Sequence, residues 1–223
     1  MKLKYISFVA FAMTLSLSSC YDLNRFPGDQ LSNEKFYRNE EHAKEAMMAV
    51  YNQMQKEDVF GLQFAMDGLG GIAMGYDPQS YQTIQRGTYD VKNGRVLGKW
   101  QNLYEGIARA NGVLQNVDRC QMSDELKVQY KAEAKFMRAL YYFTLMDFFG
   151  GVPIYDESVI VSESYSEMKN KRESIENVRA FILKDLKEAA DKLPEAWDKA
   201  NYGRATKYAG LAQMGKVYLY AKN

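Results

Sequence analysis

Cys20 is the residue whose surroundings most clearly predict a chemical modification. It follows the apolar residues 5–17 and two serines, behind a short basic start that contains Lys2 and Lys4. The apolar run is too short for an ordinary membrane-spanning helix, and a cysteine directly after such a run is typical of a bacterial lipobox. The alternative is an ordinary secretory leader with a cysteine there by chance. We predict that residues 1–19 are a lipoprotein signal peptide and that acyl chains on Cys20 anchor the protein to a membrane.

The rest of the sequence offers little for catalysis or metal binding. His42 is the single histidine, and His42 with Glu45 one helical turn away supplies too few ligands for a zinc site. The 28 acidic residues could form a carboxylate pair for glycoside hydrolysis almost anywhere, so such a pair carries no information. The sequence has no glycine-rich phosphate-binding pattern, and its net charge of +1 does not indicate nucleic acid. We therefore predict a protein that is not an enzyme, with no cofactor and no metal.

Residues 58–98 combine many glycines with aromatic and planar polar side chains. This segment holds eight glycines and interrupts a sequence that otherwise shows helical periodicity. An irregular segment of this length is usually functional or disordered, and its aromatic content argues against disorder. The side chains that we predict to contact a ligand lie in its middle: Tyr76, Asp77, Gln79, Tyr81 and Gln82.

The helix predicted over residues 124–149 is the one around which the chain is organised. Its first half has a polar stripe that we expect to face solvent, made of Lys127, Lys131, Lys135 and Arg138. From residue 139 onward Asp147 is the only charged residue, and a helix that is apolar all round is surrounded by other helices. Two glycines and a proline at 150–153 are expected to end it.

Four more segments have the periodicity of amphipathic helices, over residues 33–56, 99–118, 174–193 and 206–222. We expect Ser32, Ser123 and Thr206 to be N-caps. The last four of the five helices pair into two helix hairpins. The predicted fold is therefore all-α, a tetratricopeptide-like helix-hairpin array with a long irregular loop insertion.

Three motifs carry a resemblance to a known family. Residues 132–153 read AEAKFMRALYYFTLMDFFGGVP, residues 100–111 read WQNLYEGIARAN, and residues 203–206 read GRAT. The first resembles a signature of the SusD/RagB family, AEAxFxRAxxYFxL followed by a GGVP-like stop, and the other two are also similar to motifs of that family. These proteins are surface lipoproteins that bind nutrients, mostly glycans, beside an outer-membrane transporter.

The resemblance implies both a location and a function. It implies a lipid-anchored protein of the outer membrane that faces the cell exterior. There it would bind an oligosaccharide or other nutrient and deliver it to a SusC-like TonB-dependent outer-membrane transporter. Aromatic rings suit the C–H face of a sugar and planar polar groups suit its hydroxyls, so the side chains predicted within residues 76–82 fit such a ligand. The alternative is a helical-repeat docking module that binds a protein partner and has no ligand-binding activity of its own.

The resemblance also divides the chain. Residues 20–32 are expected to be a tether, and residues 33–223 the N-terminal helical domain of the family. Family members usually run to about twice this length, so we expect a fragment or a truncated form, whose last helix would expose apolar surface.

Three side chains in the motifs have specific expected roles. Trp100 is predicted to belong to the core because of its helical register, with a sugar platform as the alternative. Asn111, on an apolar helix face, is expected to bond a neighbouring backbone group. Glu133 is expected to pair with a basic residue of the helix array.

Overall fold

A computed structural model describes residues 36–61, 77–78, 81–90, 92–159 and 171–221. The chain divides into two units, residues 1–36 and residues 37–223, and the described part belongs almost entirely to the second. Cys20, the tether and Ser32 lie outside the described residues. Within the described residues the regular elements are helices and there is no strand, which confirms the predicted all-α class.

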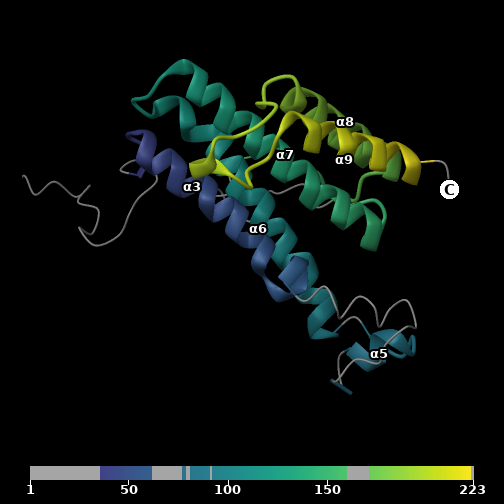
Figure 1. Cartoon of the computed structure of the whole chain (residues 1–223). Coiled ribbons are helices and arrows are strands. Elements are labelled where there is room, and N and C mark those ends of the chain that lie inside the picture. The colour runs from purple at the N-terminus through teal and green to yellow at the C-terminus, as the bar shows by residue number, and fades with distance from the viewer. Residues whose placement is uncertain (1–35, 62–76, 79–80, 91, 160–170, 222–223) are drawn as a thin grey trace, which may run out of the picture. The chain divides into compact units, whose positions relative to one another are not determined.

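The described elements follow one another along the chain as Figure 1 shows. They are α3 (Glu40–Asn52), η1 (Gln53–Gln55), η2 (Glu57–Gly61), α5 (Tyr81–Gln85), α6 (Gly94–Asn116), η3 (Val117–Arg119), α7 (Asp124–Phe149), α8 (Ile175–Ala190), η4 (Lys199–Asn201) and α9 (Lys207–Tyr220). The predicted hairpins are present, because α6 packs against α7 and α8 packs against α9. In the described part of the chain, we find no helix with the length and apolarity of a membrane span.

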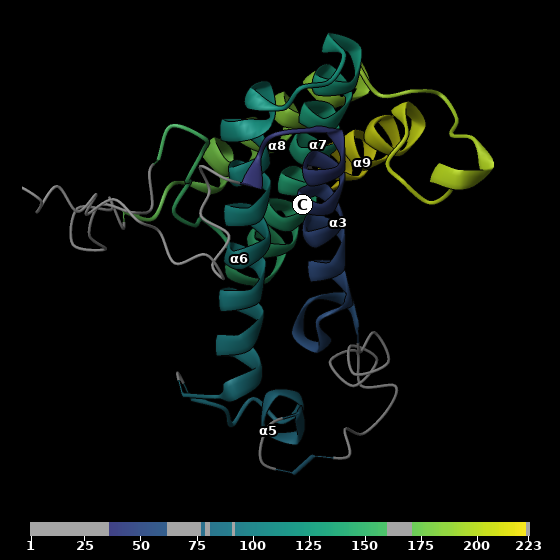
Figure 2. The same cartoon turned by 90° about the vertical axis from the view of Figure 1, so that its left-hand side faces the viewer.

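The helix α7 is central, as predicted. It packs against α3, α6, α8 and α9, and the two views of the ribbon show it among these helices (Figures 1 and 2). Residues 141–146 of its second half are all buried, and the fully buried side chains there include Tyr141, Tyr142 and Leu145. Gly150 ends it with a positive φ of 72°, a conformation that glycine adopts without a Cβ clash.

The N-terminus of each long helix is capped by a polar side chain. The caps are Asn39 for α3, Asn93 for α6, Ser123 for α7, Ser174 for α8 and Thr206 for α9. Each accepts a hydrogen bond from a backbone N–H in the first turn, which would otherwise lack a partner. The predicted caps Ser123 and Thr206 are therefore confirmed.

Two helix starts differ from the prediction. The first predicted helix was placed from residue 33, but residues 37–39 are not helical and α3 begins at Glu40 behind Asn39. The helix α6 begins at Gly94 rather than at residue 99, because Asn93 accepts from the N–H groups of Arg95 and Val96. Part of the segment predicted to be irregular is also helical, since it contains η2 and α5.

The prediction that Arg138 lies on the exposed polar stripe of α7 is wrong. Arg138 is 2% exposed, whereas the other members of that stripe are half-buried. The reason lies in the packing: α8 covers this side of α7 and provides Asp185, which pairs with the guanidinium. A charge can occupy such a buried position when its partner is buried with it.

Candidate functional site

The structure describes three of the five residues that we predict to contact a ligand. These are Asp77, Tyr81 and Gln82, while Tyr76 and Gln79 lie outside the described residues. The backbone N–H of Gln82 donates to the carbonyl oxygen of Asp77 at 3.1 Å, so one turn brings these two residues together. Both are half-buried, whereas Tyr81 is only 7% exposed.

Arg95, in the first turn of α6, contacts Tyr81 and so connects residues 77–82 to that helix. Its guanidinium carbon lies 4.7 Å from the centre of the Tyr81 ring, a distance at which a cation is attracted to an aromatic face. Its Nη1 atom also donates to Glu57 at 3.0 Å and to Asp58 at 3.2 Å. Because Arg95 packs on the Tyr81 ring, a sugar could stack there only on surface that Arg95 leaves open. A role of Tyr81 in ligand binding stays a prediction.

Trp100 is half-buried among other aromatic rings. Its ring centre lies 5.0 Å from that of Tyr104 and 5.1 Å from that of Phe149. Tyr104 is fixed in turn, since its hydroxyl donates to the carbonyl oxygen of Pro153 at 2.7 Å. Trp100 therefore makes the packing contacts expected of a core residue while part of it stays exposed, so neither expected role is eliminated.

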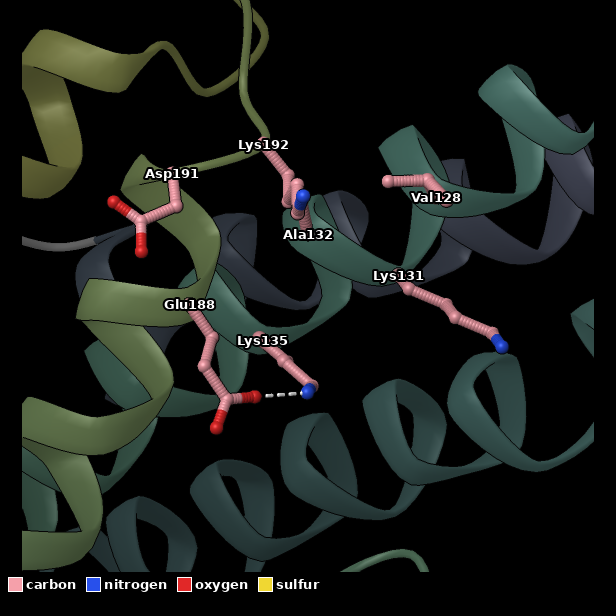
Figure 3. A pocket seen from close by; sticks show the side chains of 7 residues that line it. All are labelled: Val128, Lys131, Ala132, Lys135, Glu188, Asp191 and Lys192. Carbon is pink, nitrogen blue, oxygen red and sulfur yellow. Dashed lines mark hydrogen bonds and ion pairs between the residues drawn. The ribbon is translucent and has the colours of Figure 1, made fainter.

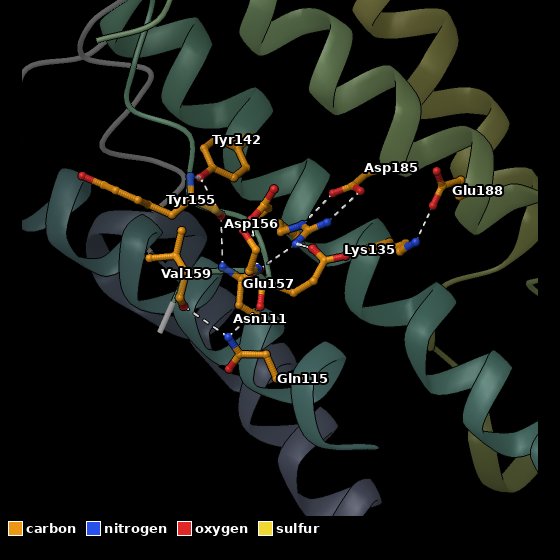
Figure 4. A network of polar contacts seen from close by, with 12 residues as sticks. Asn111, Gln115, Lys135, Tyr142, Tyr155, Asp156, Glu157, Val159, Asp185 and Glu188 are labelled. Atoms are coloured by element: carbon orange, nitrogen blue, oxygen red, sulfur yellow. Dashed lines mark hydrogen bonds and ion pairs between the residues drawn. The ribbon is translucent and has the colours of Figure 1, made fainter. Parts of the chain in front are cut away.

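A network around Arg138 connects three helices (Figure 4). The Nε and Nη2 atoms of Arg138 on α7 donate to the two carboxylate oxygens of Asp185 on α8, at 2.7 Å and 2.9 Å. Its Nη1 atom donates to Asn111 Oδ1 on α6 at 2.7 Å and to Glu157 Oε2 at 2.5 Å. The guanidinium also packs on the ring of Phe181, 5.0 Å from its centre. One buried side chain thus joins α6, α7, α8 and the segment that follows α7.

The same network holds the segment after α7 against α6 (Figure 4). Asn111 Nδ2 donates to the carbonyl oxygen of Tyr155 at 3.0 Å, which confirms that Asn111 bonds a backbone group. Gln115 Nε2 donates to the carbonyl oxygens of Glu157 at 2.8 Å and Val159 at 3.2 Å. Amide side chains therefore replace the backbone partners that this irregular segment lacks.

The charges in this network are matched to one another. Burial raises the pKa of the Asp185 carboxyl, and the hydrogen bonds from Arg138 oppose that rise. Burial lowers the pKa of the Arg138 guanidinium, but its two carboxylate partners outweigh burial and hold it above its ordinary value. Two parallel bonds between a guanidinium and a carboxylate favour the charged pair, so we infer that Arg138 and Asp185 are both ionised. These groups fix the positions of the helices that carry them.

A second network is centred on Glu133, which is fully buried on α7. Arg204 forms two hydrogen bonds with its carboxylate, one of them from Nε at 2.9 Å, and Tyr51 donates its hydroxyl at 2.8 Å. The Tyr51 oxygen then accepts from the backbone N–H of Ala205 at 2.9 Å. The guanidinium carbon of Arg204 lies 4.1 Å from the centre of the Trp197 ring. The expected basic partner of Glu133 is therefore Arg204, which joins the start of α9 to α7 and α3.

A shallow hollow of about 260 Å³ lies between α7 and α8 (Figure 3). Its lining residues are Val128, Lys131, Ala132, Lys135, Glu188, Asp191 and Lys192. Lys135 pairs with Glu188 inside it, and Lys131 pairs with Asp118 at 2.6 Å. The lining contains no aromatic ring, so this hollow lacks the stacking surface that a sugar requires. Among the described residues no group of three or more potential ligands is placed to hold a metal ion.

Sequence reasoning missed Asp185 and Glu157. Asp185 lies beside Ile182, Leu186 and Ala189, the buried positions of α8. An acidic residue beside such an apolar stripe was the available signal, since it needs a buried basic partner. Glu157 gave no comparable signal, because it follows the end of α7 in a segment without periodicity.

The helical hairpins, joined by the buried ion pairs Arg138–Asp185 and Arg204–Glu133, define an all-α scaffold of repeat type. A family model described as "Starch-binding associating with outer membrane" matches residues 28–219. The chain therefore belongs to the SusD-like family, as its three motifs predict. Three residues of these buried ion pairs, Glu133, Arg138 and Arg204, lie within those motifs.

Two curated relatives illustrate the similarity. "SusD-like protein P25" of Formosa agariphila is 26% identical over 92% of this chain and 41% of its own length. A "SusD-like protein" of Bacteroides ovatus is 28% identical over 98% of this chain and 39% of its own length. The chain thus spans about two fifths of the length of these relatives.

Solved structures agree in fold. A "Laminarin binding SusD-like protein" is 30% identical with a TM-score of 0.74, over 83% of this chain and 41% of that one. A SusD-like protein of Bacteroides fragilis is 22% identical with a TM-score of 0.73, over 89% of this chain and 38% of that one. The second likeness concerns the fold alone.

Proposed function

We propose that this protein is a lipid-anchored protein of the outer membrane that binds an oligosaccharide at the cell exterior and delivers it to a TonB-dependent transporter of SusC type. The observation that carries the proposal is the family match over residues 28–219, whose description names both starch binding and the outer membrane. The similarity at 30% identity to a laminarin-binding protein supports a glycan as the ligand.

The contacts of Arg95 support a ligand role for residues 76–82. Arg95 ties Tyr81 to the start of α6 and to Glu57 and Asp58. A contact segment held in this way loses less conformational entropy when it binds than a free loop does. We propose that Tyr76, Asp77, Gln79 and Gln82 provide ring-stacking and hydroxyl contacts, and that Tyr81 contributes mainly by holding the turn.

Glycan titration of the full chain tests this proposal, with laminarin and soluble starch as probes. If Tyr76 stacks on a sugar ring, Tyr76→Ala should weaken binding by about 1–2 kcal/mol, or roughly 5- to 30-fold. The matched control is Tyr89→Ala, since Tyr89 is 50% exposed and lies outside residues 76–82. Unchanged affinity in Tyr76→Ala would place the site elsewhere, and absence of binding by the unaltered chain would contradict glycan binding by this chain.

Acylation has a separate test. The wild-type chain should incorporate a clickable fatty acid, and Cys20→Ala should not, with the altered chain accumulating as precursor or soluble protein. Delivery to a transporter requires that the two proteins meet, so a SusC-type transporter should copurify with the wild-type chain. An unlabelled wild-type chain would refute the anchor.

Protein docking is a second candidate function, and one observation favours it. The outward face of α9 exposes several large apolar side chains, including Leu219 at 68% exposure. Transporter or protein binding without any glycan binding would favour this candidate over the first.

A further inference from the structure

The short helix α5 depends on side-chain contacts for its position. It has only five residues, and it carries Tyr81 and Gln82, two of the residues predicted to contact a ligand. A helix of this length is not stable on its own in water, so contacts with other elements must hold it. Both views of the ribbon show α5 beside the start of α6 (Figures 1 and 2), yet among the described elements it makes no extensive contact with another helix. Individual side chains therefore decide where α5 lies.

Asn93 provides one of these contacts while it caps α6. Its Oδ1 atom accepts hydrogen bonds from the backbone N–H groups of Arg95 at 3.0 Å and Val96 at 3.2 Å. Its Nδ2 atom donates to Thr83 Oγ1 on α5 at 3.1 Å. Asn93 is buried, with 8% of its surface exposed. The two ends of one buried amide group thus join the start of α6 to the middle of α5.

The backbone between the two helices folds back so that Thr83 and Asn93 can meet. The N–H of Thr88 donates to the carbonyl oxygen of Thr83 at 2.9 Å, and the N–H of Asn93 donates to that of Asp90 at 3.1 Å. Gly87 has a positive φ of 66°, which allows the chain to turn directly after α5. The bond between the side chains of Thr83 and Asn93 closes this connection between positions ten residues apart.

Capping alone does not require an asparagine at this position. Ser123, Ser174 and Thr206 cap three other helices of the array with a hydroxyl oxygen. Serine, threonine and asparagine are all common N-caps, but only the amide of asparagine has an N–H donor beside the capping oxygen. The amide nitrogen of Asn93 therefore serves a purpose other than capping, and in the structure that purpose is the contact with α5.

Arg95 and Asn93 hold α5 at two different points. The guanidinium carbon of Arg95 lies 4.7 Å from the centre of the Tyr81 ring, at the first residue of α5. Asn93 bonds Thr83, which is the third residue. One contact would leave a short helix able to turn about it, whereas two contacts fix its orientation as well. Gln82 lies between the two held residues.

We propose that Asn93 is a positioning residue for ligand binding, which holds α5 through Thr83 and so keeps Gln82 in place for the bound glycan. The proposal rests on the glycan-binding role proposed above for residues 76–82. Asn93 acts through α5 and does not itself touch the ligand. A segment that is already in place loses less conformational entropy on binding, so loosening α5 should weaken binding even though every contact residue is unchanged.

Two variants break the bond from opposite sides. Asn93→Ser keeps a capping oxygen but has no amide nitrogen, and Thr83→Val removes the acceptor while Asn93 still caps α6. Trypsin cleavage after Arg86 measures how firmly α5 is held, because Arg86 is exposed directly behind α5 and proteases cut segments that open locally. Mass spectrometry identifies this cut in the full chain. We expect it to become about 2- to 10-fold faster in each variant, the range that one ordinary hydrogen bond gives.

Titration of the same full-length variants with laminarin measures the consequence for binding. The affinity should fall by a similar factor, about 2- to 10-fold, in each single variant. The double variant Asn93→Ser/Thr83→Val should bind no more weakly than the weaker single variant, because both changes break the same bond. The matched control is Ser174→Ala, which removes the cap of α8 and should change neither the affinity nor the cleavage after Arg86.

Three results would overturn the proposal. Unchanged cleavage after Arg86 in both variants would show that the bond does not hold α5. Faster cleavage with unchanged laminarin affinity would show that the position of α5 does not matter for the ligand. Losses that add up in the double variant would show that Asn93 and Thr83 act separately. If the unaltered chain binds neither laminarin nor starch, the proposed glycan binding fails instead, and the cleavage rates still decide whether Asn93 holds α5.

Discussion

The helices α7 and α9 are each the second member of a hairpin, and both carry apolar residues on opposite faces. The array covers most of α7, with α3, α6 and α8 among its neighbours, and residues 141–146 are buried without a break. Within the described residues it covers α9 on the face of Val217, whereas Tyr208, Leu211 and Leu219 on the other side are exposed. Apolar residues on two opposite faces are thus mostly buried in α7, whereas in α9 the described residues bury only one face. An apolar helix pattern predicts what a helix can bury, whereas burial itself depends on its neighbours.

The buried charges separate the two helices further. Glu133 and Arg138 lie inside the array on α7, and each is held by a partner from another element. The charged residues of α9 are at least partly exposed. We therefore expect changes at the buried charges of α7 to affect the free energy of unfolding strongly, and changes at the exposed apolar positions of α9 to affect it little.

Arg138→Ala should have the largest effect. It leaves Asp185 buried without its guanidinium, and breaking a buried pair in this way costs about 3–5 kcal/mol of unfolding free energy. Urea unfolding followed by circular dichroism measures the loss. The double variant Arg138→Leu/Asp185→Leu should recover much of it, because it removes both charges. A loss below about 1 kcal/mol in the single variant would show that the pair is not buried as described.

Tyr51→Phe should lower the free energy of unfolding by an intermediate amount, because Tyr51 helps to connect α7 to the start of α9. The change removes one of three hydrogen bonds to Glu133, which keeps those from Arg204, and it removes the acceptor for the N–H of Ala205. The expected cost is about 1–3 kcal/mol, measured by the same unfolding experiment. Tyr218→Phe is the control, since Tyr218 is 54% exposed. Equal losses of unfolding free energy in the two variants would argue against the contacts of Tyr51 with Glu133 and Ala205.

Thr206→Ala should cost about 1 kcal/mol, because it removes the side-chain oxygen that caps α9. Ser123→Ala does the same at the start of α7, so the two variants compare equivalent caps on the two helices. Similar losses in urea unfolding are expected, since a cap acts locally. If the loss at Ser123 were several times larger, fraying at the start of α7 would have to disturb its neighbours as well.

Leu219→Ser should have the smallest effect on stability. Leu219 is 68% exposed, and surface substitutions of this kind usually change the unfolding free energy by no more than about 0.5 kcal/mol. Thermal unfolding at a protein concentration low enough to keep the chain monomeric measures it. A loss above about 2 kcal/mol would mean that this face of α9 is covered within a single copy.

The parts of the fold that depend on local signals could be predicted from the sequence. The helix over residues 124–149 was placed correctly at both ends, because Ser123 caps its start and a pair of glycines ends it. Thr206 was recognised as a cap for the same reason. Hairpin pairing followed from the order of the periodic segments and from small alanines on the second helix of each pair, a pattern typical of helix-hairpin repeats.

Features that depend on distant residues could not be predicted. Arg138 looked like a member of a polar stripe, because Asp185, which makes its burial possible, lies 47 positions further along the chain. The start of α6 was missed because its cap, Asn93, occurs in a glycine-rich segment that hides the beginning of the periodicity. For the candidate site, residue types indicated Tyr81, but only the structure shows Arg95 packed on its ring.

The fluorescence of the two tryptophans can report separately on the packing at the end of α7 and on the contacts at the start of α9. The Trp197 indole donates its N–H to the carbonyl oxygen of Ala205 at 2.7 Å, and the guanidinium of Arg204 lies over its ring. We therefore expect its fluorescence emission to respond to changes at the Arg204–Glu133 pair. Trp100 lies against Tyr104 and Phe149, and its emission reports on the packing of α6 against the end of α7. A chain with one of them replaced by phenylalanine carries a single tryptophan, whose emission can be excited selectively over that of the tyrosines. Time-resolved unfolding can then follow the surroundings of Trp100 or of Trp197 without an attached dye.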